Sequence, residues 1–210
     1  MFHSLRRTAM TLIASSFAIV GLVSCDSATA LRTGEISLRL TDAPGDVVAA
    51  VVTIDQIYLQ SSENSDAGRI VLRDEDFTTN LLTLVGTTAE LINAAVIPVG
   101  SYGQLRFVIS GAYLEVEGEG GTTEFYASSP TYAGLPLGTV LAGSLQMPSL
   151  AQSGLKVNLP NSAVVINEDE TVTLTIDFDV AQSFGKLAGR SGNWVMRPLL
   201  QAIVTPPLTP

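Results

Sequence analysis

Apolar and polar residues alternate with a period of two over several short stretches of the chain. The clearest is TVTLTIDFDV at residues 171–180, which places valine, leucine, isoleucine and phenylalanine on one side and threonine and aspartate on the other. Similar alternation occurs at residues 36–40, 105–109 and 155–159. Because successive side chains of a strand point to opposite faces, each stretch predicts a half-buried β-strand.

Residues 51–60 also predict a strand, but their apolar positions change phase between Ile54 and Ile57. One extra residue in a strand shifts the side chains that follow it to the other face. We therefore expect a β-bulge near Asp55 and Gln56, which returns the later apolar residues to the core.

The segment IPVGSYGQLRFVIS, residues 97–110, combines a turn with a regular strand. Pro98 and Gly100 mark the turn, and Tyr102 opens the strand. The Pro-x-Gly-x-Tyr pattern is typical of immunoglobulin-like and transthyretin-like sandwiches, where the tyrosine packs at a corner with its hydroxyl bonded to the backbone. We expect this structural role for Tyr102.

The remaining segments complete an all-β pattern. Residues 112–116 and 124–127 predict a hairpin around the glycine-rich turn 118–121, and residues 128–144 form the longest irregular stretch. Residues 88–95 contain better helix formers and predict one short helix. We expect an all-β fold, an antiparallel β-sandwich of immunoglobulin-like or transthyretin-like type with about nine or ten strands and at most one or two short helices.

The expected domain boundaries follow from these elements. A single β-sandwich domain covers residues 34–204, preceded by a linker at 25–33. Residues 205–210 form a proline-rich tail that cannot pair as a strand. Residues 1–24 differ in character from the rest of the chain.

The N-terminal segment has the pattern of a signal peptide. Arg6 and Arg7 precede the uncharged, mostly apolar residues 9–23. As a helix, this run would be about 22 Å long, less than the roughly 30 Å of a bilayer's hydrocarbon core. We therefore expect a targeting signal and not a permanent membrane span.

Cys25, the one cysteine of the chain, directly follows this run and is preceded by Leu22, Val23 and Ser24. These residues resemble the lipobox of bacterial lipoproteins. The resemblance implies that Cys25 carries a diacylglyceryl group, becomes the first mature residue, and tethers the protein to the membrane on the periplasmic or cell-surface side of the bacterial cell envelope. The alternative is an ordinary secretory signal that leaves Cys25 as a free thiol.

The negative net charge of the chain excludes nucleic acids as expected partners. Without residues 1–24, which contain two arginines and no acids, nine basic residues face twenty acidic ones, a net charge of −11. No basic stripe is present, so we expect no nucleic-acid partner and no electrostatic attraction to anionic headgroups.

The residue types available for catalysis are few. The one histidine, His3, lies in the signal segment, and no cysteine other than Cys25 exists. Ser-His-Asp and Cys-His nucleophilic mechanisms and metal sites built from histidine or cysteine are therefore excluded. We expect a protein that is not an enzyme and has no cofactor, with Ca²⁺ as the one ion worth considering.

Two pairs of carboxylates are candidate ligand or metal sites. Asp42 and Asp46 flank an Ala-Pro-Gly turn and are either Ca²⁺ ligands or simply turn-forming residues, the second being favoured. Asp177 and Asp179 share one face of a strand. They are either half of a metal site or a glycosidase pair, or, as favoured, a solvated face whose repulsion is eased by an arginine such as Arg197 or Arg106.

Three aromatic residues lie in or beside the long irregular stretch. Phe125, Tyr126 and Tyr132 are either a stacking platform for a sugar or a protein partner, or a lid packed over the sheet edge, which we favour.

With these segments placed, the chain resembles a bacterial family known as domain of unknown function 4382, which consists mostly of lipoproteins and other exported proteins. The resemblance covers roughly residues 34–204 and implies an extracytoplasmic all-β domain, but it brings no established activity and no functional residues. The matching segments are LRLTDAPGD (38–46), NLLTL (80–84), IPVGSYGQLRFVI (97–109), PSLAQSGLKVNL (148–159), LTIDFDV (174–180) and VMRPLL (195–200).

Taken together, these features predict a membrane-anchored lipoprotein of the cell envelope that acts as a non-enzymatic binding or interaction module, its partner an envelope protein or a glycan. The alternatives are an envelope hydrolase that uses carboxylates, based on the acidic pairs, and a Ca²⁺-stabilised structural or adhesion module, based on Asp42 and Asp46.

Overall fold

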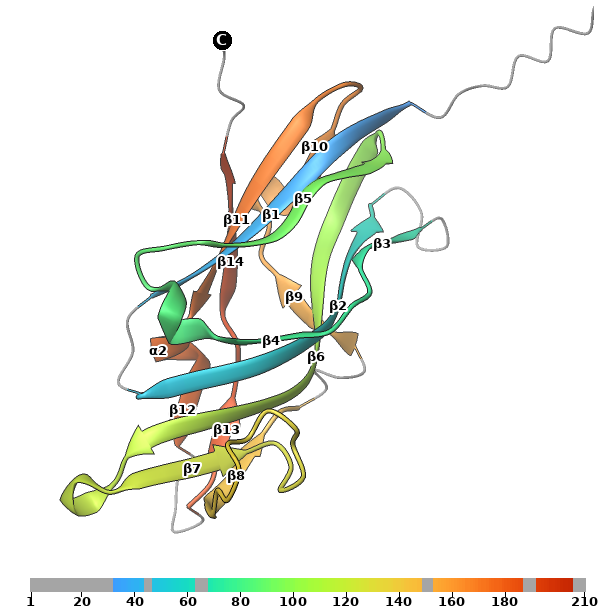
Figure 1. Ribbon diagram of the computed structural model, residues 1–210. Coiled ribbons are helices and arrows are strands. Elements are labelled where there is room, and N and C mark those ends of the chain that lie inside the picture. Colours follow the sequence, from blue (N-terminus) through green and yellow to red (C-terminus); the bar gives the residue numbers. More distant parts are fainter. Residues whose placement is uncertain (1–31, 44–46, 63–67, 149–152, 187–191, 206–210) are drawn as a thin grey trace, which may run out of the picture. The chain divides into compact units, whose positions relative to one another are not determined.

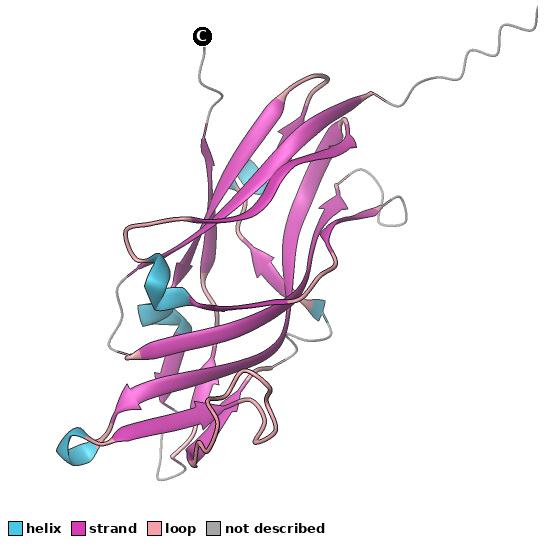
Figure 2. Ribbon diagram, in the orientation of Figure 1, coloured by secondary structure: helices cyan, strands magenta, loops and turns pink. Residues whose placement is uncertain are grey.

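The computed structural model describes residues 32–43, 47–62, 68–148, 153–186 and 192–205 (Figure 1). These residues consist mainly of strands, with one short α-helix and three 3-10 turns (Figure 2). The strands are β1 (Thr33–Ala43), β2 (Ala49–Ser61), β3 (Arg69–Arg73), β4 (Phe77–Asn80), β5 (Ala89–Pro98), β6 (Gly100–Glu117), β7 (Thr123–Ala127), β8 (Leu141–Gln146), β9 (Leu155–Val157), β10 (Val164–Ile166), β11 (Thr171–Asp179), β12 (Phe184–Lys186), β13 (Trp194–Met196) and β14 (Leu200–Thr205). The helical elements are η1 (Leu81–Leu84), η2 (Glu119–Gly121), η3 (Pro160–Ser162) and α2 (Val180–Ser183).

The strands form two sheets. The smaller has the order β14-β11-β1-β5. The larger follows the path β12-β13-β8-β7-β6-β2-β3, with β9 and β10 paired to β6 and β4 paired to β2. Figure 1 shows that β6 is the long strand of the larger sheet, which connects its two ends.

One apolar core lies between the sheets and contains residues of both. Ile36, Leu38 and Leu40 of β1 are at most 1% exposed, and so are Leu105 and Phe107 of β6. The alternate positions of β11 from Val172 to Phe178 are buried in the same core. The prediction of an all-β sandwich is thus confirmed, because strands with a period-two pattern bury one face each against the other sheet.

Three details of the fold differ from the expectation. The sheets are mixed, since β1 pairs with β11, β7 with β8 and β13 with β8 in parallel. The described residues form fourteen strands, because pieces of only three residues, such as β12 and β13, are too short to show a period. Residues 88–95 lie mainly in strand β5 and do not form the expected helix.

The physical reason for the strand at β5 is tertiary packing. Leu91 and Ile92 are adjacent in sequence, yet both are buried. The register with β1 shifts near Leu38, and Ala94 has a φ of 47°. These irregularities remove the period of two from the sequence, while burial against β1 overrides the local helix propensity.

Two local predictions are confirmed. In β2, Ile54 pairs with Ile109 and Gln56 with Val108, so Asp55 is the extra residue of a bulge. The later residues Ile57 and Leu59 are fully buried. The Tyr102 hydroxyl donates to the Pro98 carbonyl oxygen at 2.7 Å, as expected for a corner tyrosine.

A second, smaller apolar cluster lies at the β7 end of the larger sheet. It consists of Ala49, Val51, Tyr113 and Ala127, with Phe125, Tyr132, Leu135 and Leu141 packed against it. The segment 128–140 between β7 and β8 thus covers part of the sheet. Of the helices in the described ranges, none has the length and hydrophobicity that a membrane span needs.

Candidate functional site

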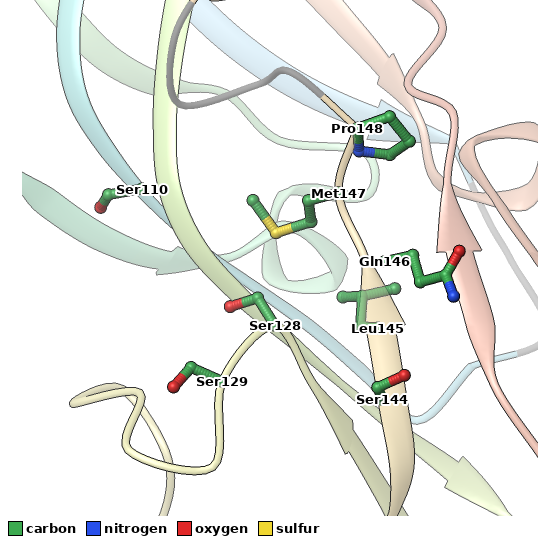
Figure 3. Close-up of a pocket in the computed structure, with 8 residues that line it drawn as sticks. All are labelled: Ser110, Ser128, Ser129, Ser144, Leu145, Gln146, Met147 and Pro148. Atoms are coloured by element: carbon green, nitrogen blue, oxygen red, sulfur yellow. The ribbon is translucent and has the colours of Figure 1, made fainter.

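The described surface has a hollow of about 530 Å³ where β8 and the segment after it approach β6 and the end of β7. Its lining is rich in hydroxyl groups and consists of Ser110, Ser128, Ser129, Ser144, Leu145, Gln146, Met147 and Pro148 (Figure 3). Figure 3 shows Met147 reaching from the end of β8 toward the side of Ser110 and Ser128, whereas Gln146 points the other way. This hollow offers hydroxyl groups beside the apolar side chains of Leu145, Met147 and Pro148.

A second hollow of about 440 Å³ adjoins the first, because Ser110 lines both. Its other lining residues are Thr53, Asp55, Asp76, Thr78, Tyr132, Ala133 and Gly134. We call the two hollows together the Ser110 groove. Their volumes fall in the range of ligand pockets in proteins.

The bulge in β2 positions the groove's central pair. Thr53 pairs with Gly111 and Ile54 with Ile109, so the register skips Ser110 on β6 and then Asp55 on β2. Ser110 Oγ donates to Asp55 Oδ1 at 2.5 Å. The two residues that the register skips, Ser110 and Asp55, are therefore hydrogen-bonded to each other. The bulge directs the Asp55 carboxylate away from the core, as bulges commonly do.

Tyr132 is fixed by hydroxyl contacts at its far end. Its hydroxyl lies 2.6 Å from Thr53 Oγ1, which lies 2.7 Å from Thr78 Oγ1. Burial raises the pKa of the Tyr132 phenol, and the nearby Asp55 charge adds to this. The phenol therefore stays protonated at neutral pH and retains its hydrogen to donate.

Two glycines make room for the Tyr132 ring. A Cβ atom on Gly111 would lie 2.4 Å from Cε2 of Tyr132, and one on Gly134 would lie 2.6 Å from its Cζ. Both distances are far below van der Waals contact, so only glycine allows the segment 128–140 to approach β6 this closely. The ring also packs at 6.3 Å from that of Tyr113.

These contacts settle the role of the three aromatic residues. Tyr126 is 6% exposed and its ring lies 6.0 Å from Trp194, while Phe125 packs against Tyr113. Tyr132 thus holds the segment 128–140 onto the sheet, as the lid prediction expected, whereas Phe125 and Tyr126 are residues of strand β7 and Tyr126 packs in the main core. Tyr132 contributes its hydroxyl network to the groove rather than an open ring face.

The charge of the groove is one-sided. Among the described residues that line it, none is Lys, Arg or His, whereas Asp55 and Asp76 are carboxylates. Such a lining repels anions and favours neutral or cationic ligands. Within the described ranges, no group of three or more His, Cys, Asp or Glu residues is placed to hold a metal ion.

The structure places Asp177 and Asp179 on the outer side of β11, away from the Ser110 groove lining. Burial raises the pKa of Asp177, and the neighbouring charge of Asp179 raises it further. Asp179 accepts from the backbone amide of Gln182 at 3.0 Å and thereby caps α2. Asp179 therefore has a structural role as the cap of α2. The surroundings of the two carboxylates are not equivalent.

The expected ion pair between an arginine and this carboxylate pair is not found among the described residues. Arg106 instead donates to Gln104 Oε1 and to the carbonyl oxygen of Ser153. No ion pair in the described ranges joins Asp177 or Asp179 to Arg106 or Arg197. The prediction was wrong because Arg106 bonds within its own strand and to the segment before β9.

Cys25 and Asp46 lie outside the described residues. Asp42 pairs with Phe178 through its backbone at the end of β1. The Ca²⁺ hypothesis for Asp42 and Asp46 and the lipid attachment at Cys25 stay predictions.

Sequence reasoning did not find Ser110, Asp55 or Asp76 as site residues. One signal for Asp55 was present, since the phase change in residues 51–60 located the bulge. The hydrogen bond between Asp55 and Ser110 depends on the pairing of β2 with β6, which a single sequence does not show.

Comparison with known proteins gives a family but no activity. Residues 33–198 match the family described as Domain of unknown function (DUF4382), and the chain belongs to this family. No curated protein and no solved structure gives a significant match.

Proposed function

We propose that this member of the family is a lipid-anchored binding module of the bacterial cell envelope, tethered through Cys25 and without catalytic activity of its own. The observation that carries the anchor is the sequence around Cys25, in which Leu22, Val23 and Ser24 follow an apolar run too short to span a bilayer. One acyl chain binds a membrane only marginally, so the two or three chains of a lipoprotein are needed for a stable tether.

The short length of chain between Cys25 and the first strand supports this proposal. The first strand begins at Thr33, so residues 26–32 separate the anchor from the sandwich. An extended segment of seven residues reaches about 25 Å at most. A folded body at the end of such a linker stays close to the membrane surface.

The Ser110 groove supports binding as the activity of that body. Its carboxylate and hydroxyl groups are held by hydrogen bonds before any ligand arrives, namely Ser110 to Asp55 and Tyr132 to Thr53. A site that is already ordered loses little conformational entropy when it binds.

The composition supports a role without catalysis. Residues 26–210 contain no histidine and no cysteine. The carboxylate pair considered for hydrolysis, Asp177 and Asp179, does not line the Ser110 groove. A general acid and base acting on one ligand would need to face each other across it.

The anchor is tested by expressing the full chain in a bacterial host with and without globomycin, which inhibits the peptidase that cleaves before lipidated cysteine. We expect globomycin to cause a precursor to accumulate that is larger by the 24 residues of the signal. Without the inhibitor, the Cys25→Ser variant should give an uncleaved precursor of the same polypeptide length but without the diacylglyceryl group, and the matched Ser27→Ala variant should be processed normally. Processing of Cys25→Ser at the normal size, or insensitivity to globomycin, would contradict the proposal.

A further inference from the structure

We propose that the Ser110 groove binds an uncharged saccharide. This inference rests on the proposed binding function and names the class of ligand for the same groove. It depends on three properties of the lining: its hydrogen-bonding capacity, its charge and its apolar parts.

The hydrogen-bonding groups of the groove both donate and accept. Ser128 and Ser129 contribute hydroxyl groups, each with one hydrogen and two lone pairs, and the Ser129 hydroxyl is already hydrogen-bonded to Thr131. Ser128 Oγ already accepts from the Ala112 amide at 3.1 Å, which fixes its position and leaves its hydrogen for a ligand. Asp55 accepts from Ser110 through one carboxylate oxygen, so the other oxygen is available as an acceptor.

A sugar satisfies this mixture better than a basic peptide does. Ammonium and guanidinium groups only donate hydrogen bonds, so a lysine or arginine ligand would leave the hydroxyl hydrogen of Ser128 without an acceptor. A sugar hydroxyl donates to a carboxylate such as Asp55 and accepts from a serine at the same time. Leaving polar groups unpaired in a complex costs affinity, so the saccharide is favoured.

Charge excludes the anionic ligands. Asp55 and Asp76 line one hollow, and no cationic side chain among the described residues lines either hollow. Phosphates, nucleotides, anionic headgroups and uronic acids would all be repelled at this short range.

Apolar parts of the groove complement the C–H faces of a sugar ring. Met147 extends toward the side of Ser110 and Ser128, and Pro148 follows it (Figure 3). Ala133 contributes a methyl group to the second hollow. Alternating polar and apolar contacts along two joined hollows suit a chain of sugar rings rather than a single ring.

The test uses the full chain, purified in detergent, and titration calorimetry. The probes are neutral tetrasaccharides (maltotetraose, cellotetraose, chitotetraose and mannotetraose), with tetralysine, tetragalacturonate and CaCl₂ as comparison ligands. We expect at least one neutral tetrasaccharide to bind. Ser110→Phe fills the junction of the hollows and should weaken that binding by about tenfold or more, which corresponds to roughly 1.4 kcal/mol.

Matched variants separate loss of the site from loss of the fold. Thr205→Phe adds the same side chain on the exposed end of β14, and it should bind like the unmodified protein. Asp55→Asn keeps the shape of the groove but removes a charged acceptor, and it should weaken binding, whereas Asp169→Asn in an exposed turn should not.

Two results would overturn the assignment. One is that no neutral tetrasaccharide binds, or that only tetralysine, tetragalacturonate or Ca²⁺ binds. The other is sugar binding that Ser110→Phe leaves unchanged. Either result is independent of globomycin sensitivity, so failure of the ligand class and failure of the lipid anchor are distinguished.

Discussion

At the scale of single residues, the Tyr132 ring leaves no room for a side chain at Gly111. A Cβ atom at position 111 would meet the tyrosine ring at 2.4 Å, and Gly111 is itself buried in β6. We expect Gly111→Ala to displace the ring and to lower the free energy of unfolding by about 1–3 kcal/mol, the usual cost of overpacking.

Gly185→Ala is the matched control for this prediction. A Cβ atom at Gly185 would meet no atom within 4 Å, so the same substitution should leave stability nearly unchanged. Urea unfolding followed by tryptophan fluorescence measures both variants. Equal stability of the two would mean that Tyr132 does not pack against β6 as described.

A second residue-scale prediction concerns pH. Burial and the charge of Asp179 raise the pKa of Asp177 in the folded protein. The folded state therefore binds a proton more tightly than the unfolded state, so this residue reduces stability once the pH rises above its folded pKa, and does not do so below its unfolded pKa.

Asp177→Asn should consequently raise the melting temperature at pH 7, by about 1–2 °C for a group largely in contact with solvent, and have less effect at pH 3. Melting curves by circular dichroism at the two pH values test this. A gain that is larger at pH 3 than at pH 7 would show that the folded-state pKa is not raised.

At the scale of elements, Tyr102 joins β5 to β6. Its hydroxyl donates to the Pro98 carbonyl at 2.7 Å, and the side chain is 4% exposed. We expect Tyr102→Phe to cost about 1–3 kcal/mol of unfolding free energy, because the partner carbonyl then loses its donor where water has little access.

The comparison for this variant is Tyr58→Phe. The Tyr58 hydroxyl donates to the Ser153 carbonyl over 3.4 Å at an exposed position, so its loss should cost less than that of Tyr102. The denaturant midpoints of the two variants compare these losses of stability. A greater loss at position 58 would remove the corner role assigned to Tyr102.

Elements were predictable from the sequence where burial follows a simple period. β11 and the start of β6 have one buried face each, so their alternation was visible, and the bulge at Asp55 showed as a single change of phase. β5 was not recognised, because Leu91 and Ile92 are buried side by side and the strand is irregular at Ala94.

The pairing of strands that are far apart in the chain could not be predicted from the sequence. β1 pairs in parallel with β11, with Ile36 opposite Val172, although more than a hundred residues separate them. Alternation reports that a strand has a buried face, but not which strand lies beside it. An antiparallel arrangement was therefore expected by default, and the mixed sheets were not.

At the scale of the whole molecule, the same limit explains why the groove was missed. Asp55 comes from β2, Ser110 from β6, Tyr132 from the segment after β7 and Met147 from the end of β8. Only the assembled sheet brings these residues together. The acidic pairs Asp42 with Asp46 and Asp177 with Asp179, by contrast, are visible in the sequence because their members are close along the chain.

At this scale, the net charge of the chain also bears on the proposed lipid anchor. Residues 25–210 have nine basic and twenty acidic residues, and a net charge of −11 opposes adsorption to an anionic bilayer. The membrane association that we propose for such a body therefore depends on a covalent apolar anchor, for which Cys25 is the candidate. The central claim of this account is that Cys25 holds an acidic binding domain at the membrane.

The most direct test is mass spectrometry of the N-terminal peptide from protein purified from membranes of its native host. The account predicts a peptide that begins at Cys25 and carries a diacylglyceryl group on its sulfur. A peptide that begins at another residue, or one with Cys25 as an unmodified thiol, would contradict it.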